Sequence, residues 1–249
     1  MRNLPLHKIE KTVAALLGVL LAILLILSAA ARNAVYMSRA AGNFSVIEDV
    51  SFEKIRAEDA PVGIVNECRF TLGEIGHADT LAFFINHHHV EVYLEGECVY
   101  SLTASDGPIR TPGGFWPMIP LHEEDAGKEV RVVLIPLYSD YQDKTPDFLL
   151  GSELAIYKAH LFQAMPEMVL SLCVVLAGLF LLCMAVYNSI RRETVFRLYA
   201  LSLLAVFTGF WRATYGRFAY LLFENHTILV YYISIISLML MAMAMLNCV

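Results

Sequence analysis

The sequence predicts a mixed membrane protein with an N-terminal transmembrane helix, an extracytoplasmic antiparallel β-sandwich and a bundle of about three transmembrane helices. Four apolar runs contain no Asp, Glu, Lys, Arg or His: residues 13–31, 168–187, 228–246 and the shorter 198–211. Hydrophobic residues make up 57% of the chain, and the mean hydropathy of +0.57 is too apolar for a soluble protein of 249 residues. An acidic, strand-patterned block separates the first run from the second.

The three long runs match the thickness of a bilayer. At about 1.5 Å of rise per residue, each run crosses the roughly 30 Å hydrocarbon core as a helix, and lipid offers the backbone no other hydrogen-bond partner. We therefore expect a cytoplasmic N-terminus and anchor helix in 1–33, a sandwich in 34–160 and helices in 161–249. The last region is expected to contain spans at about 167–187, 196–215 and 227–247.

The first run also resembles a cleavable signal peptide, with a basic start, an apolar stretch and Ala29-Ala30-Ala31. Its stretch from Val13 to Leu27 already reaches the upper length of a signal core, and the alanines extend it to a full span. We therefore favour a retained anchor.

Charge sets the orientation. Basic clusters lie before the first run and after the second: Arg2, Lys8 and Lys11, then Arg191, Arg192 and Arg197. Cytoplasmic loops are rich in Lys and Arg, so both clusters are expected inside a multi-pass plasma-membrane protein, although Arg212 and Arg217 then lie outside. The outer block, residues 32–166, has 20 acidic and 10 basic residues, which argues against nucleic acid as a partner.

Two helix ends need comment. Pro166 is expected at the start of the second helix, where its missing N–H costs nothing. The third run, 198–211, is too short to cross alone, so it must extend through Arg212 toward Tyr215. We interpret Arg212 as an interfacial side chain that reaches toward the headgroups rather than as a functional charge inside the bilayer.

The acidic block has the pattern of β-strands. Short runs rich in Val, Ile, Phe, Tyr and Thr, separated by Gly, Pro and Asp turns, predict strands at 69–72, 80–86, 90–94, 98–102, 116–121 and 129–137. Apolar residues largely alternate in 90–94 and 130–134, so one face of each strand should be buried. Glu95-Gly96-Glu97 should close a hairpin between 90–94 and 98–102. Many short strands at this spacing are typical of a β-sandwich.

In their order and pattern, residues 89–100, 112–121 and 127–132 resemble a galactose-binding-like jelly roll. This sandwich is similar to the extracytoplasmic domain of bacterial seven-transmembrane receptors with diverse intracellular signalling modules. The likeness continues through 148–152, as the last sandwich strand, and through the helices of 198–246. It implies an anchor, a jelly-roll sensor and a helical membrane domain ahead of a cytoplasmic output, such as a diguanylate cyclase, a histidine kinase or a DNA-binding domain.

The chain departs from that family in having three spans after the anchor, not seven, and in ending at Val249 without an output domain. We expect either a truncated chain or a reduced sensor that acts through a partner, and an end so close to a span favours truncation. The expected partners are the lipid bilayer, a small-molecule or carbohydrate ligand and, as an open alternative, a second copy of the chain.

The resemblance implies a ligand held by an aromatic platform, for which Phe115, Trp116, Tyr138 and Tyr141 are the candidates. Trp116 lies between Pro112-Gly113-Gly114 and Pro117, and we favour for it the rival role of closing the end of the sandwich.

Other chemistry is weakly indicated. His87 and His89 would share a strand face and could bind a metal, but they lack a third ligand, and we favour a polar strand entry. The carboxylates of Glu123, Glu124 and Asp125 are expected to be solvated, and neither a catalytic motif nor a cofactor motif is present. Cys68 and Cys98 could form a disulfide, although separately buried thiols are favoured.

We therefore expect the sensory and membrane portion of a bacterial receptor, with residues 157–165 as the mechanical link from the sensor to the second helix. The alternative is a non-catalytic carbohydrate-docking subunit of an envelope enzyme complex. A small transporter is disfavoured, because the spans lack paired charges inside the membrane.

Overall fold

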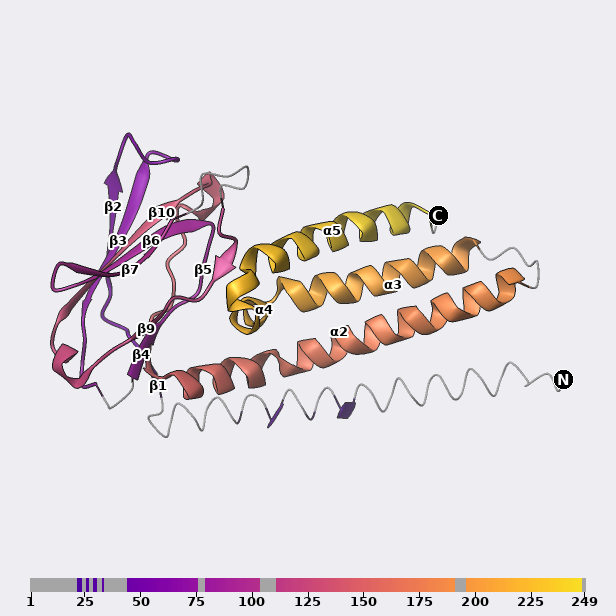
Figure 1. The fold of residues 1–249 in the computed structure, drawn as a ribbon, viewed down its shortest axis with the longest axis horizontal. Helices are drawn as coiled ribbons and strands as arrows, with labels where there is room; N and C mark the ends of the chain where they lie inside the picture. The colour runs from indigo at the N-terminus through magenta and orange to yellow at the C-terminus, as the bar shows by residue number, and fades with distance from the viewer. Residues whose placement is uncertain are drawn as a thin grey trace.

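A computed structural model describes residues 22, 23, 26, 29, 30, 33, 44–75, 79–103, 111–190 and 196–247. Strands in residues 44–152, called here the β-domain, lie at one end of a long molecule, and helices α2 to α5 extend away from them (Figure 1). The anchor expected in 1–33 falls almost wholly outside the described residues, as do Arg191 and Arg192.

The β-domain contains two main antiparallel sheets. The strands are β1 Phe44–Val46, β2 Ser51–Arg56, β3 Ile64–Thr71, β4 Asp79–Ala82, β5 Ile85–Asn86, β6 His88–Leu94, β7 Glu97–Leu102, β8 Gly114–Phe115, β9 Met118–Pro120, β10 Glu129–Pro136 and β11 Leu149–Ser152. One sheet has the order β1-β11-β4-β9 and the other β2-β3-β10-β6-β7, while β5 pairs with β8. Single-turn helices at Glu123–Asp125 and Ser139–Tyr141 flank β10.

Both sheets bury side chains in one hydrophobic core. In β10, Val130, Val132 and Leu134 are buried while the residues between them are not, which is the period-two pattern of a strand with one covered face. From the facing sheet, Leu81 and Leu150 enter the same core. The expectation of a β-rich block with half-buried strands is therefore confirmed.

The expected hairpin is confirmed, but its turn is shorter than expected, because Glu97 already belongs to the second strand. Val90 pairs with Leu102 and Leu94 with Glu97 across β6 and β7. Glu95 and Gly96 both have positive φ, 49° and 87°, as a two-residue type I′ turn requires.

Other strand boundaries differ from expectation. The strand expected at 80–86 is two strands, and the one expected at 116–121 is reduced to β9 with β8 before it. Strand β2 had no sequence signal because all six of its side chains are exposed, so no apolar alternation marks it. Strand β11 agrees with the last strand that the family resemblance implied.

Cys68 and Cys98 are both free thiols. They lie on β3 and β7, and since β10 and β6 run between these strands, the two backbones are roughly 14 Å apart. Burial, followed by the nearby charge of Glu67, raises the pKa of Cys68 to about 11. Cys98 is exposed, so the expectation that both thiols are buried is wrong for this residue.

Helix α2 follows β11 without a linker. The helices are α2 Glu153–Ile190, α3 Phe196–Tyr215, α4 Arg217–Leu222 and α5 Thr227–Leu246, with a short turn at Glu224–His226. Ser152 Oγ accepts a hydrogen bond from the backbone N–H of Ala155 at 3.4 Å, as an N-terminal capping residue does. The expectation that the helix starts near Pro166 is therefore wrong, because Pro166 lies inside a continuous helix of 38 residues.

Two of the described helices, α2 and α5, are long and apolar enough to cross a membrane. Helix α3 has the expected bounds, but it does not meet the same criterion and carries Arg197 and Arg212. Arg212 donates a hydrogen bond to Glu167 Oε1 of α2 at 2.6 Å, so it is paired with a neighbouring helix.

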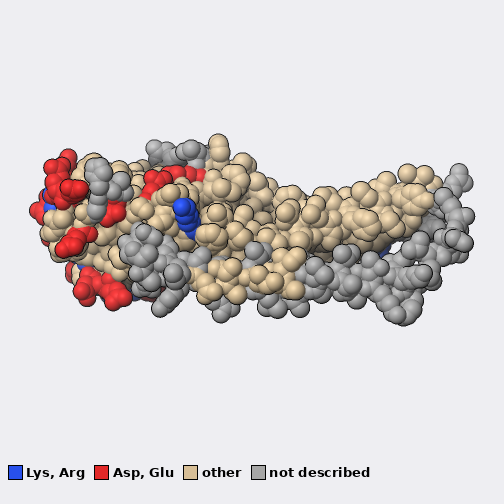
Figure 2. All heavy atoms as spheres, turned by 90° about the horizontal axis from the view of Figure 1, so that it is seen from below, with Lys and Arg blue, Asp and Glu red and all other residues tan. Residues whose placement is uncertain are grey.

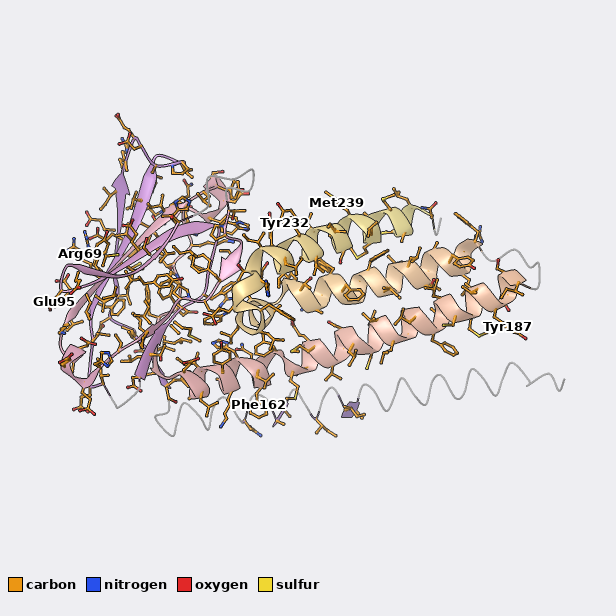
Figure 3. The ribbon with its side chains drawn as sticks, viewed as in Figure 1. Arg69, Glu95, Phe162, Tyr187, Tyr232 and Met239 are labelled. Carbon is orange, nitrogen blue, oxygen red and sulfur yellow. The ribbon has the colours of Figure 1, made fainter. Side chains whose placement is uncertain are left out.

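The two ends of the molecule have different surfaces. Acidic side chains gather over the β-domain, and the helices show a nearly uncharged surface in the same view (Figure 2). Large apolar side chains project outward from α2 and α5, among them Tyr187 and Met239, whose exposed fractions are 48% and 63% (Figure 3). An apolar exterior of this extent indicates a surface that another phase or molecule covers.

Two glycines bring α2 and α3 into close contact. A Cβ added to Gly209 of α3 would lie 2.8 Å from the Ser171 carbonyl oxygen and 3.1 Å from the Val175 nitrogen of α2. A Cβ added to Gly178 of α2 would likewise lie 2.8 Å from the Val206 nitrogen of α3. Because the obstructing atoms belong to backbone, only a movement of the whole helix can relieve the overlap.

We predict that Gly209→Ala destabilises the helix pair. Alanine gains about 1 kcal/mol of helix propensity, but overpacking against backbone costs roughly 1–3 kcal/mol, so the net effect is a loss. Thermal unfolding of the detergent-solubilised full chain measures it. Gly216→Ala, at the N-cap of α4, is the control for steric overlap, since no atom of the described residues lies within 4 Å of a Cβ there. Equal melting temperatures for the two variants would contradict the close packing.

Candidate functional site

The β-domain and the helices share a second hydrophobic core, called here the junction core. Ile156 and Ala159 of α2, Leu221 of α4 and Val230 of α5 are buried against Trp116 and other residues of the β-domain. Thr227 Oγ1, at the first residue of α5, donates a hydrogen bond to the Pro112 carbonyl at 3.3 Å. The two parts of the molecule are therefore joined through three helices rather than by one connection.

Trp116 is buried in the junction core. Its Nε1 donates a hydrogen bond to the Arg217 carbonyl at 3.0 Å, and its ring lies 4.4 Å from that of His160 on α2. Phe115, the preceding residue, is buried in the core of the sheets. These two predicted platform residues thus lie in separate cores, and Trp116 closes the end of the β-domain against the helices.

Tyr138 and Tyr141, the other two predicted ligand residues, meet at His87. The His87 ring packs edge-on against Tyr141 at 4.7 Å, Tyr231 of α5 at 5.3 Å and Tyr138 at 5.5 Å. His87 is itself in the left-handed backbone region, with a φ of 55°. A non-glycine residue there carries backbone strain, which concentrates at functional positions.

A cavity of about 650 Å³ lies beside this cluster, between the β-domain and the helices. The β-domain contributes residues 84–88 and the loop at 141–145 to its wall. The helices contribute aromatic residues from three elements: Trp211 and Tyr215 of α3, Tyr220 of α4 and Tyr231 of α5. A ligand in this cavity would contact both parts of the protein at once.

Two polar side chains in the cavity wall have unsatisfied atoms. Asn86 Oδ1 and His88 Nε2 are buried and have no hydrogen-bond partner among the described residues. His88 has an exposed fraction of 0%. The Tyr141 carbonyl is close enough to His88 to raise the pKa of this histidine, but it is not in hydrogen-bonding geometry with His88 Nε2. Buried polar atoms are normally paired, but Asn66 Oδ1 and His89 Nε2, outside the cavity wall, are unpaired as well, so these atoms alone do not mark a ligand site.

Burial keeps both histidines neutral. Desolvation is the main cause that lowers the pKa of His87, and the charges of His88 and Lys144 lower it further. Desolvation also dominates the lowered pKa of His88. His88 Nδ1 lies 2.5 Å from the Asn86 carbonyl, which only accepts hydrogen bonds, so Nδ1 is the donor in this contact.

Two cations line the same cavity, Lys144 and Arg217. Neither forms an ion pair with a carboxylate in the part of the chain that the structure describes. Each instead faces an aromatic ring: Lys144 Nζ lies 4.4 Å from the centre of Tyr141, and the Arg217 guanidinium 5.3 Å from that of Phe84. The carboxylate of Asp143 is paired with Lys54. Both cations are thus available to an anionic ligand.

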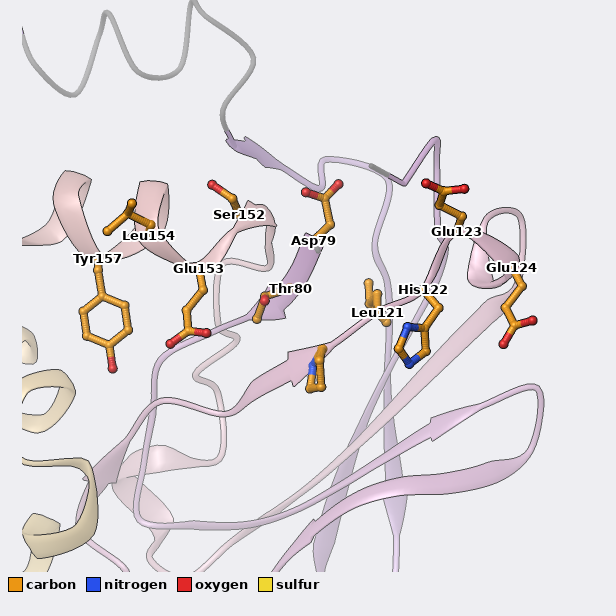
Figure 4. A pocket seen from close by; sticks show the side chains of 11 residues that line it. Asp79, Thr80, Leu121, His122, Glu123, Glu124, Ser152, Glu153, Leu154 and Tyr157 are labelled. Atoms are coloured by element: carbon orange, nitrogen blue, oxygen red, sulfur yellow. The ribbon is translucent and has the colours of Figure 1, made fainter. Parts of the chain in front are cut away.

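A larger, open pocket of about 1140 Å³ lies at the edge of the β-domain, beside the first turns of α2 (Figure 4). Its wall carries Glu124, Glu153 and His122. Next to it, Asp125 is buried rather than solvated as expected. Hydrogen bonds from Lys128 and the His122 backbone lower the pKa of its carboxyl, and Lys128 Nζ lies 2.7 Å away.

The described residues contain no group of three or more His, Cys, Asp or Glu side chains placed to hold a metal ion. Strand β6 begins at His88, and the left-handed His87 precedes it, so His87 and His89 do not share a strand face as the metal hypothesis required.

Of the four residues that the sequence suggested for ligand binding, Tyr141 lines the cavity and Tyr138 packs beside it against His87, but sequence reasoning missed most of the cavity. Asn86, Lys144 and Tyr231 come from three distant segments, and only the folded chain brings them together. The one available signal was the run His87-His88-His89, whose first two members line the cavity wall.

Comparison with known proteins gives no relative from which a function could be transferred: no family model matches the chain, and no significant match to a curated protein was found.

We predict that His87→Asn flattens the dependence of stability on acid pH. A neutral buried histidine favours the folded state above the ordinary pKa of 6.5, and this stability is lost as the pH falls from there toward the lowered pKa. Asparagine removes the titration and tolerates positive φ. The measurement is the difference in melting temperature between about pH 7.5 and about pH 5.5.

The exposed His122 provides the control, and His122→Asn should keep the wild-type difference. An unchanged difference in His87→Asn would show that burial of His87 does not contribute to acid sensitivity.

Proposed function

We propose that the chain is the membrane-bound sensory module of a bacterial signalling receptor, with a jelly-roll sandwich outside the cell and a helical membrane domain. Two antiparallel sheets around one core support the sandwich. The acidic β-domain beside helices that expose apolar side chains supports a boundary between water and lipid near the junction core. In this proposal α3 is a third span and residues 13–31 form the anchor.

The observation that carries the proposal is the cavity between the β-domain and α3, α4 and α5. A site confined to one rigid part could be filled without consequence for the other. Here the walls belong to both parts, so a ligand stabilises those relative positions of the helices in which its contacts to both walls are satisfied. A ligand shifts a conformational equilibrium only by such differential affinity.

Helix α2 provides the path for the signal. It starts at Glu153, directly after β11, and continues through residues 157–165, which the sequence suggested as a separate link, to Ile190. A displacement at the β-domain is therefore carried along about 57 Å of helix without an intervening loop.

A second candidate, the carbohydrate-docking subunit of an envelope enzyme complex, is favoured by the open pocket of Figure 4. The exposed carboxylates of Glu124 and Glu153 could accept hydrogen bonds from sugar hydroxyls. This function predicts that the chain copurifies with a catalytic partner and that filling the junction cavity leaves the helices in place.

We predict that the β-domain is outside the cell. Cys98 is exposed on β7, whereas Cys68 is buried, so a membrane-impermeant maleimide should label intact cells through Cys98. Cys98→Ala should remove this labelling. Labelling of Cys98 that appears only after permeabilisation would show that the orientation is inverted.

We predict that filling the cavity moves the helices. Ser234 of α5 is buried in the cavity wall, and Ser234→Phe places a ring where a ligand would bind. Spin labels on non-canonical residues at positions 190 and 246, both highly exposed in wild type, report the separation of α2 and α5 by pulsed electron paramagnetic resonance. We expect a shift of roughly 1–2 Å or more in the distance distribution.

Ile236→Phe is the matched control, because position 236 is exposed on the same helix and does not line the cavity. Identical distributions for wild type and Ser234→Phe would exclude coupling between the cavity and the helices.

A further inference from the structure

The cavity continues beyond the β-domain into the groove between α3 and α5. Its α5 wall runs from Tyr231 to Leu238, which is about 10 Å along the helix axis. On α3 the wall includes Tyr215 and, one turn farther from the β-domain, Trp211. The site is therefore elongated along the helices.

The two ends of this elongated site differ in polarity. The end at the β-domain has the Lys144 and Arg217 cations. The end between the helices has mainly apolar wall residues, Trp211, Ile235 and Leu238. A small polar solute would leave the apolar end uncovered, and a hydrocarbon would leave the polar end unpaired.

We propose that this cavity binds an anionic membrane phospholipid whose headgroup carries a phosphodiester. The phosphate lies between Lys144 and Arg217. One acyl chain lies against Trp211 and Leu238 in the groove between α3 and α5. The inference rests on the proposed membrane placement, and it makes the bilayer itself the source of the ligand.

The chemistry of the cavity selects among headgroups. Phosphatidylglycerol supplies a phosphate with one net negative charge, which matches a site with two cations. Phosphatidylcholine has the same phosphate but adds a positive charge, which the two cations disfavour. Soluble glycerol phosphate has the polar groups without the chain, so it should compete weakly.

The test uses the fluorescence of Trp211 in the full chain reconstituted in nanodiscs. The chain has two tryptophans, so Trp116→Phe leaves Trp211 as the only emitter. Phospholipids brominated on the acyl chain quench a tryptophan that they contact. We expect phosphatidylglycerol to quench at a lower mole fraction than phosphatidylcholine with the same brominated chains, by about fivefold for each cation that contributes.

Variants test whether the preference for phosphatidylglycerol over phosphatidylcholine arises in the cavity. Lys144→Gln together with Arg217→Gln should bring the two lipids to parity, while Lys158→Gln, an exposed position on α2 outside the cavity, should preserve the preference. Equal quenching by the two lipids, full persistence in the double variant, or displacement by millimolar glycerol phosphate would overturn the proposal.

A second measurement covers the case in which Trp116→Phe does not fold. Native mass spectrometry of the wild-type chain released from micelles should show retained phosphatidylglycerol, which Ser234→Phe removes by filling the cavity. If the wild-type chain retains neither phosphatidylglycerol nor phosphatidylcholine, the proposal is overturned. Because these measurements report binding alone, lipid binding without helix movement would leave this inference standing and exclude the sensory function.

Discussion

The direct continuation of strand β11 into helix α2 is the constraint on which the rest of the structure depends. The strand ends at Ser152 and the helix starts at Glu153, so no flexible residue separates the sheet from the helix. The first turns of the helix are held at the β-domain, because Ile156 and Ala159 are buried in the junction core with Trp116. The β-domain therefore cannot tilt without moving the near end of α2.

Helix packing extends this constraint from α2 to the helices that form the wall of the cavity. Gly178 and Gly209 allow α2 and α3 to pack backbone against backbone, so these two helices respond as a pair. Helix α5 is fixed separately, by the hydrogen bond from Thr227 to the Pro112 carbonyl and by the ring of Tyr231 beside His87. The cavity lies where these two attachments meet. A change in its volume must be absorbed by α5, by α3 or by the strained loop at His87.

The sequence predicted what depends on neighbouring residues and missed what depends on distant ones. The hairpin of β6 and β7 was predictable because its turn consists of two adjacent residues, Glu95 and Gly96. Helix α3 was predictable from its apolar run. Pro166 was misleading, since proline usually marks the first turn of a helix, but packing of the preceding turns against the β-domain stabilises a helix that continues through it. The cavity was not predictable as a whole, because its wall is assembled from strands, loops and three helices.

Unpaired cations separate the cavity from the rest of the β-domain in a way that burial alone does not. Asp125 is also buried, yet Lys128 and the His122 backbone satisfy its carboxylate, so this cluster has a structural role that is complete within the chain. Unpaired polar atoms are not special to the cavity, since Asn66 Oδ1 and His89 Nε2 lie outside its wall and are as unpaired as Asn86 Oδ1 and His88 Nε2. Lys144 and Arg217 line the cavity without a carboxylate partner among the described residues, beside the strained backbone of His87. An anion bound between these two cations completes the site.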